Sequence, residues 1–144
     1  GDAAQITASL GANYEITKNL KIDANYRYND KLYAAIDAEK FVNETNKGTL
    51  ELPNYGLLDA GISFKMLVDP KKTNTLDFRF NINNVLDKIY ISESRTNIFA
   101  DDYVSGTTGP TYESAGKLSD GVATGNQVFF GFGRTWNLTL KYNF

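Results

Sequence analysis

Five segments of this chain alternate between apolar and polar residues. From Gln5 to Thr17 every even position is apolar and every odd position is polar or glycine. A period of two residues places the apolar side chains on one face of a β-strand, whereas a helix would need them three or four residues apart. The alternation predicts an all-β chain with five long strands, at about residues 5–17, 20–34, 55–67, 75–93 and 134–144.

The connections between the predicted strands alternate between short and long. Lys18-Asn19 separates the first two strands, and a segment around 68–74 separates the third from the fourth. The segments 37–54 and 94–133 are much longer, and the second is rich in Gly, Ser, Thr and Asp. We therefore expect an antiparallel up-and-down meander with tight turns at one end and two long loops at the other. Transmembrane β-barrels show the same asymmetry.

Alternation alone does not say which face of the sheet meets water. In a soluble sandwich or barrel the apolar face points inward, whereas in a membrane barrel it meets lipid and the polar face lines a wet interior. Runs of about ten residues or more exceed the usual soluble strand and match tilted membrane strands. Aromatic residues near strand ends, such as Tyr14 and Tyr142, and polar-face charges, such as Asp23 and Arg79, also favour the membrane interpretation.

The composition narrows the chemistry that the chain can perform. Its 144 residues include no His and no Cys, which excludes imidazole and thiolate metal ligands, Ser-His-Asp and Cys-His nucleophiles, and disulfides. With 15 Lys+Arg against 17 Asp+Glu the net charge is -2, so the basic excess of nucleic-acid-binding proteins is missing. We predict a protein that is not an enzyme, holds no cofactor and has no nucleic-acid partner.

Asp101-Asp102 is the candidate cation site of the second long loop. Paired carboxylates offer the oxygen ligands that Ca²⁺ takes. The surrounding residues lack the regular ligand spacing of a calcium-binding loop. We therefore interpret the pair as a solvated turn and predict no metal site.

Three segments of the chain resemble motifs of TonB-dependent outer-membrane receptors. Residues 133–144, GRTWNLTLKYNF, are similar to the last barrel strand of that family, in which alternating apolar residues finish in a terminal Phe. Residues 80–90, FNINNVLDKIY, resemble the N-x-x-N-L-F-D-K-x-Y strand next to last, with Leu86 in place of the usual Phe. Residues 52–61, LPNYGLLDAG, resemble the L-P-x-Y-x-x-x-D entry to the strand before it. The motifs keep the family's order, and their style is most similar to receptors of Bacteroides-type bacteria.

The resemblance implies a 22-stranded transmembrane β-barrel closed by an N-terminal plug domain. The predicted strands would be the last five, and the chain would be a fragment that supplies about a quarter of the barrel. The tight turns would then lie on the periplasmic side, and 37–54 and 94–133 would be extracellular loops. The family implies a place in the bacterial cell outer membrane and the active import of a scarce or large solute, such as a siderophore, cobalamin, haem or a glycan.

The same resemblance implies a set of partners. The lipid bilayer would surround the strands, and the barrel-assembly machinery would insert them. The TonB complex would supply energy through the plug domain, which this sequence does not contain. The transported solute would bind the receptor, and a surface lipoprotein is a further candidate partner.

Two sets of residues are candidates for these roles. The assembly machinery would read the apolar residues of the last strand, which are Trp136, Leu138, Leu140, Tyr142 and Phe144. Aromatic residues of the second long loop are candidates for contact with solute, because flat rings stack on sugars and macrocycles. These residues are Phe99, Tyr103, Tyr112, Phe129 and Phe132. The alternative for this second set is that the rings pack the loop.

Two other interpretations of the alternation stay open. A soluble lipocalin-like β-barrel that binds a small apolar ligand would need about eight strands. Segments near Val42, Leu50, Ile91 and Val128 would then have to pair as additional strands. A complete small outer-membrane barrel would have a structural or adhesive role. Five strands alone would leave two unpaired edges and an uncovered apolar face, because closed membrane barrels need at least about eight strands.

Overall fold

Five long strands dominate the structure, a computed structural model in which residues 3–36, 47–69, 71 and 73–144 are described. The described residues form strands, turns and extended segments but no helix, so the prediction of an all-β chain is confirmed. The long strands are β1 (Ile6–Thr17), β2 (Leu20–Asp30), β5 (Tyr55–Asp69), β6 (Asn74–Asn83) and β11 (Thr135–Asn143).

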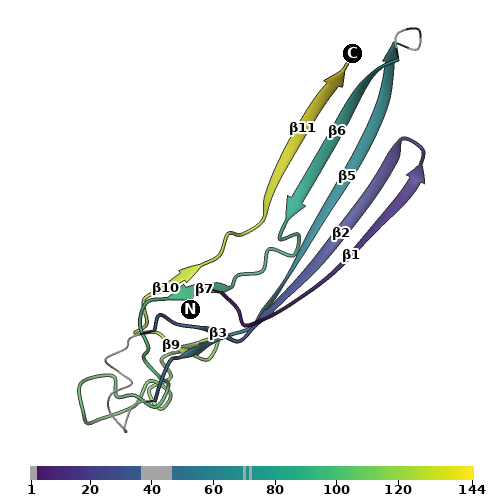
Figure 1. The fold of residues 1–144 in the computed structure, drawn as a ribbon. Helices are drawn as coiled ribbons and strands as arrows, with labels where there is room; N and C mark the ends of the chain where they lie inside the picture. Colours follow the sequence, from purple (N-terminus) through teal and green to yellow (C-terminus); the bar gives the residue numbers. More distant parts are fainter. Residues whose placement is uncertain (1–2, 37–46, 70, 72) are drawn as a thin grey trace. The chain divides into compact units, whose positions relative to one another are not determined.

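These strands form a single sheet in which they follow one another in chain order, β1-β2-β5-β6-β11 (Figure 1). The pairs β5–β6 and β6–β11 are antiparallel, as a meander requires. Strands β1 and β11 are the two edges of this sheet.

Six short strands pair in three separate two-stranded sheets. The segments near Leu50, Ile91 and Val128 do pair, but within these small sheets and not with the long strands, while Val42 lies outside the described residues. The pairs are β3 (Leu32–Tyr33) with β4 (Glu51–Leu52), β7 (Ile91–Ser94) with β10 (Val128–Phe130), and β8 (Leu118–Ser119) with β9 (Val122–Ala123).

The chain divides into two compact units. The sheet unit comprises Ala8–Tyr28, Gly56–Lys88 and Phe132–Phe144, and the loop unit comprises Gly1–Thr7, Asn29–Tyr55 and Ile89–Gly131. Of the eight buried hydrophobic residues described, only Leu57 belongs to the sheet unit. The long connections, and not the long strands, therefore hold most of the described hydrophobic core.

The core of the loop unit joins the two long connections of the chain, 31–54 and 84–134. Leu32, Leu50 and Leu52 come from the first connection, and Ile91 and Val122 come from the second. All five are at least nine-tenths buried. Since burial of one such side chain stabilises a fold by about 1.5–3 kcal/mol, this cluster is a substantial source of stability.

One tyrosine from each of two family-like motifs stacks on the other in the loop unit. The ring centroids of Tyr55 and Tyr90 lie 4.1 Å apart at an interplanar angle of 29°. Gly131 donates its backbone N–H to the carbonyl oxygen of Tyr90 at 2.9 Å, and a Cβ at Gly131 would come within 1.9 Å of the Tyr90 ring. Glycine is required at this position because the Tyr90 ring approaches the backbone so closely.

The strand expected at 20–34 ends earlier than predicted. β2 stops at Asp30, because Lys31 adopts a left-handed backbone conformation with φ of 55°. The Lys31 N–H donates to Oδ1 of Asp30 at 2.9 Å, and Leu32–Tyr33 then pairs with β4. The alternation is interrupted at Asp30, and the apolar residues at Leu32 and Ala34 then resume it, which extended the predicted strand beyond its observed end.

The strand expected at 75–93 is in fact two strands. β6 ends at Asn83 and β7 begins at Ile91. Between them Asn84 and Asp87 both have a positive φ, of 50° and 52°, and the Asp87 N–H donates to the Asn84 carbonyl oxygen at 2.9 Å. The segment that resembles a receptor strand therefore contains a turn. The other three long strands match the predicted bounds within two residues.

Asn84 bonds within this turn region to Lys88 and also connects it to β5 and to Phe132. Its backbone N–H donates to Oδ1 of Asp59 at 2.9 Å, and its side-chain Oδ1 accepts from the Lys88 N–H at 2.9 Å. Its Nδ2 donates to the carbonyl oxygens of Lys88 and Phe132. Asn84 is only 4% exposed, so its removal would leave buried backbone groups without partners.

We predict that Asn84→Ala lowers the free energy of unfolding of the chain in detergent micelles by about 1–3 kcal/mol, because buried polar groups lose their partners. The matched control is Asn83→Ala, which removes a single exposed hydrogen bond to Thr135. That control should change the free energy by less than about 0.5 kcal/mol in the same denaturant titration. Equal effects of the two substitutions would contradict the role given to Asn84.

Candidate functional site

Apolar side chains of neighbouring strands form rows on one face of the sheet. The register of β5, β6 and β11 places an apolar residue opposite an apolar residue at every second position. Cross-strand pairs of this kind stabilise a sheet through direct side-chain contact. The rows are Ala60 with Ile82 and Trp136, Ile62 with Phe80 and Leu138, Phe64 with Phe78 and Leu140, and Met66 with Leu76 and Tyr142.

This apolar face is widely exposed. The exposed fraction is 39% at Ile22, 55% at Leu138 and 77% at Leu10. Trp136, the single Trp of the chain, is 70% exposed. Large contiguous exposed apolar surfaces mark sites of contact with proteins or membranes. The arrangement is therefore suited to contact with an apolar environment.

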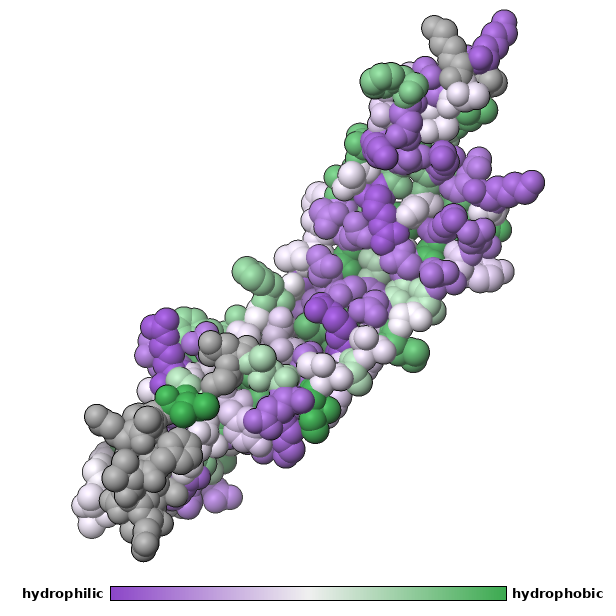
Figure 2. Space-filling model, viewed as in Figure 1, coloured by the Kyte–Doolittle hydropathy of each residue, from purple (hydrophilic) through white to green (hydrophobic). Residues whose placement is uncertain are grey.

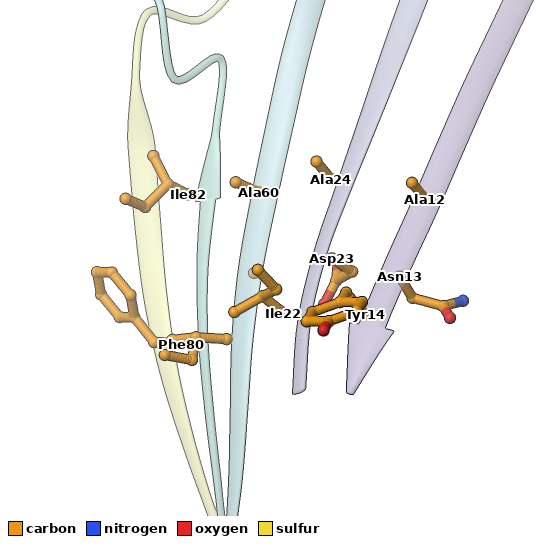
Figure 3. A pocket seen from close by; sticks show the side chains of 11 residues that line it. Ala12, Asn13, Tyr14, Ile22, Asp23, Ala24, Ala60, Phe80 and Ile82 are labelled. Atoms are coloured by element: carbon orange, nitrogen blue, oxygen red, sulfur yellow. The ribbon is translucent and has the colours of Figure 1, made fainter. Parts of the chain in front are cut away.

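A shallow hollow lies on the apolar face where small side chains are neighbours. Figure 3 shows Ala12, Ala24 and Ala60 at similar heights on β1, β2 and β5. The larger side chains Tyr14 and Phe80 border a volume of ≈ 450 Å³. The hollow is lined mainly by apolar side chains, with Asn13 and Asp23 also among its lining residues.

The opposite face carries a polar network centred on Arg79. Its guanidinium donates two hydrogen bonds to Asp23 on β2, one of them from Nη2 to Oδ1 at 2.8 Å. It therefore crosses β5, where Gly61 leaves room, because a Cβ at that position would meet Nη2 of Arg79 at 2.4 Å. Arg79 also donates to Asn81, whose Nδ2 donates to Oδ1 of Asn137 on β11 at 3.0 Å. The network joins β2, β6 and β11.

Other charges on the polar face are paired as well. Nζ of Lys21 lies 2.5 Å from Oε1 of Glu15, and Nη2 of Arg27 lies 2.9 Å from Oδ2 of Asp59. Hydrophilic residues gather over the long strands in the view of Figure 2. Paired charges of both signs are suited to a hydrated surface.

The candidate assembly residues lie where the alternation predicts them. Trp136, Leu138, Leu140 and Tyr142 take part in the apolar rows, and Phe144 follows the end of β11 and is fully exposed. The polar residues between them belong to the other face, as Asn137 shows by its bond to Asn81. Recognition of these residues by an assembly machinery stays a prediction.

The five candidate solute-contact residues have different surroundings. Phe99 packs against the core of the loop unit, and Tyr112 lies against Gly125, where a Cβ would come within 2.3 Å of the Tyr112 hydroxyl. Tyr103 and Phe129 are 46% and 38% exposed in the loop unit. Phe132 belongs to the sheet unit. Packing therefore accounts for Phe99 and Tyr112, whereas Tyr103 and Phe129 keep accessible rings, and contact with solute stays a prediction for all five.

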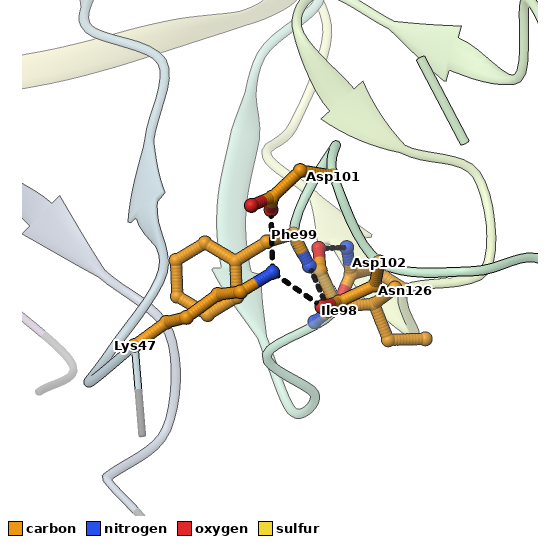
Figure 4. A network of polar contacts seen from close by, with 6 residues as sticks. All are labelled: Lys47, Ile98, Phe99, Asp101, Asp102 and Asn126. Carbon is orange, nitrogen blue, oxygen red and sulfur yellow. Dashed lines mark hydrogen bonds and ion pairs between the residues drawn. The ribbon is translucent and has the colours of Figure 1, made fainter. Parts of the chain in front are cut away.

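Asp101 and Asp102 both accept hydrogen bonds from Lys47. Its Nζ lies 2.6 Å from Oδ1 of Asp101 and 2.7 Å from Oδ1 of Asp102, and 5.6 Å from the centre of the Phe99 ring (Figure 4). The ammonium group thus occupies the position between the two carboxylates that a cation would take. Asp102 also accepts from the Phe99 N–H through Oδ2 at 2.7 Å.

The ion pairs shift the pKa values of this cluster in opposite directions. The hydrogen bond from Lys47 lowers the pKa of Asp101 below its ordinary value of 3.8. The hydrogen bonds to Asp101 and Asp102 raise the pKa of Lys47 above its ordinary value of 10.5. Asp101 therefore adds stability that is present above pH 3.8 and is lost as the pH falls through its lowered pKa. Lys47 adds stability that is lost only above pH 10.5.

Sequence reasoning identified the two aspartates but missed Lys47. Lys47 is separated from Asp101 by 54 positions, and no pattern around it distinguishes it from the other lysines. A signal did exist for Arg79, because a glycine inside a strand, such as Gly61, often marks the close approach of another group.

Within the residues that the structure describes, no group of three or more Asp or Glu side chains could hold a metal ion. The same residues include no helix that is long and apolar enough to cross a membrane. Comparison with protein-family models, curated proteins and solved structures finds no match to this chain.

We predict that Lys47→Met raises the pKa of Asp101 toward its ordinary value of 3.8, because the carboxylate loses its charged donor. A titration of the side-chain carboxyl resonances by NMR measures this change. Lys117→Met, at an exposed lysine of the same unit, is the control and should leave the Asp101 titration unchanged. An Asp101 pKa that does not respond to Lys47→Met would contradict the ion pair.

Proposed function

We propose that this chain forms part of the barrel wall of a TonB-dependent outer-membrane receptor, an active transporter for a scarce or large solute. The observation that carries the proposal is the widely exposed apolar face of five paired strands, set opposite a face of paired charges. A transmembrane barrel needs this distribution, because its outer face meets hydrocarbon and its inner face meets water.

The lengths of the strands support the same proposal. β6 has 10 residues, β2 has 11 and β1 has 12, whereas soluble strands usually have about five or six. A tilted strand crosses the hydrocarbon core of a bilayer with about nine to eleven residues. The long strands of this sheet are therefore of the length that membrane crossing requires.

The two edge strands of the sheet need further strands as hydrogen-bond partners if the sheet lies in a membrane. Inside a membrane every backbone N–H and C=O must find a partner in the protein, because no water is present to replace it. β1 and β11 each present an unpaired edge in the described sheet. In the proposed receptor, further strands of a 22-stranded barrel pair with both edges and close the sheet.

The alternatives fit these observations less well. A lipocalin-like barrel encloses its apolar face around a ligand, and here Leu10 and Trp136 on that face are 77% and 70% exposed. The additional short strands do not join the long sheet. A complete small outer-membrane barrel would need about eight strands in one closed sheet, whereas five are described here.

The connections fit the two sides of such a receptor. The pairs β1–β2 and β5–β6 are joined by short segments, which we place on the periplasmic side. The long connections would be extracellular, and the accessible rings of Tyr103 and Phe129 are then available to a solute. The proposed partners are the lipid bilayer, the barrel-assembly machinery, the solute, a surface lipoprotein and the TonB complex, which acts through a plug domain.

The proposal is tested by two adjacent substitutions near the middle of β11, made in the intact gene product. Leu140→Glu puts a charge on the face assigned to lipid, where a charged side chain is destabilising. Thr139→Glu puts the same charge on the face assigned to water, directly opposite Arg79 and of opposite sign to it. We predict that Leu140→Glu strongly reduces the heat-modifiable, folded protein in outer-membrane fractions, whereas Thr139→Glu leaves its amount nearly unchanged.

Uptake measurements in the same cells test the transport role. Cells that lack the gene should lose growth on one limiting solute among iron siderophores, cobalamin, haem and glycans, and inactivation of TonB should produce the same defect. Equal folding of the two glutamate variants would refute the membrane orientation. Normal uptake of every solute tested would refute the transport role.

A further inference from the structure

The side chain of Asn97 inserts into the strand ladder of another segment. Asn97 belongs to the second long connection, yet its Oδ1 accepts from the Leu50 N–H at 2.8 Å and its Nδ2 donates to the Ala35 carbonyl oxygen at 2.8 Å. Leu50 and Ala35 belong to the first long connection, just beyond the paired β3 and β4, where Ala34 also donates to Leu50 at 2.9 Å. The side-chain amide thus takes the place of a peptide unit between two strands of the first connection.

Other contacts between the two connections surround this amide. The Ala35 N–H donates to the Ser94 carbonyl oxygen at 2.8 Å. Asn97 itself is only 9% exposed, and the core formed by Leu50, Ile91 and other residues of both connections belongs to the same unit. Buried amide groups of this kind are costly to separate, because both partners lose their hydrogen bonds.

A second asparagine organises the second connection alone. Oδ1 of Asn126 accepts from the Thr96 hydroxyl at 2.9 Å and from the Ile98 N–H at 2.8 Å. Its Nδ2 donates to the carbonyl oxygens of Ile98 and Ala123. All four of these hydrogen bonds stay within the second connection. Asn126 fixes the segment that presents Asn97 but makes none of these bonds to the first connection.

We propose that the described parts of the two connections within the loop unit, residues 31–36 and 47–54 of the first and 89–131 of the second, open and close as one cooperative body, with Asn97 as the residue that couples them. Opening of either connection breaks the shared core and exposes the Asn97 amide together with its partners on Leu50 and Ala35. Neither connection can therefore move away alone at low cost. The coupling depends only on contacts within the loop unit.

Native-state hydrogen exchange of the intact gene product in detergent micelles tests the coupling. In Asn97→Ala, exchange at the Ala34 amide of the first connection and at the Thr124 amide of the second, neither of which donates to Asn97, should rise by one common factor, roughly ten- to hundredfold. The more discriminating variant is Asn126→Ala. It should also accelerate exchange at Ala34, although the hydrogen bonds that it removes all lie in the second connection.

The controls separate this result from general unfolding. Asn54→Ala, at an exposed residue of the first connection, should leave all these exchange rates unchanged. Amides in the ladder between β6 and β11 should keep their protection in every variant. The proposal is overturned if Asn126→Ala accelerates exchange at Thr124 but not at Ala34. It is also overturned if the sheet amides accelerate by the same factor as the loop amides, because the loop unit would then not open as a body of its own.

Discussion

Rows of apolar side chains cross β5, β6 and β11 and stand largely exposed, and this exposure constrains every other feature of the sheet. A large apolar side chain that stays in water forgoes about 1.5–3 kcal/mol relative to burial. In the proposed receptor a lipid bilayer would cover this face without any further protein layer. The described hydrophobic core lies mostly in the loop unit, which does not draw on this face.

The polar face maintains this arrangement by fixing the register. A slip of one residue between strands would exchange the apolar and polar faces of the slipped strand. Arg79 resists such a slip because it spans β5 at Gly61 and bonds to Asp23, and Asn81 bonds to Asn137 on the other side. At the end of β6, the hydrogen bonds of Asn84 to Asp59 and Lys88 fix the turn that follows the strand. Polar contacts thus determine where each apolar side chain projects.

The sequence alone predicts the five long strands and their order, because period-two alternation depends only on which face each residue occupies. It fails at Lys31 and Asn84, where a non-glycine residue with positive φ ends a strand and apolar residues resume beyond the break. It also fails to find Lys47 and Asn97, whose partners are distant in the chain. Two of the family-like motifs each contribute one residue to a single contact, because Tyr55 and Tyr90 stack on each other. These two tyrosines therefore have a structural role.

The central claim is that the apolar face of the sheet contacts lipid hydrocarbon, and Trp136 reports on it directly as the single Trp of the chain. The decisive measurement is Trp fluorescence in phospholipid vesicles whose acyl chains carry bromine. The account predicts strong quenching by the brominated chains, together with protection from aqueous acrylamide. Emission that brominated lipids leave unchanged, and that acrylamide quenches equally with and without vesicles, would contradict it.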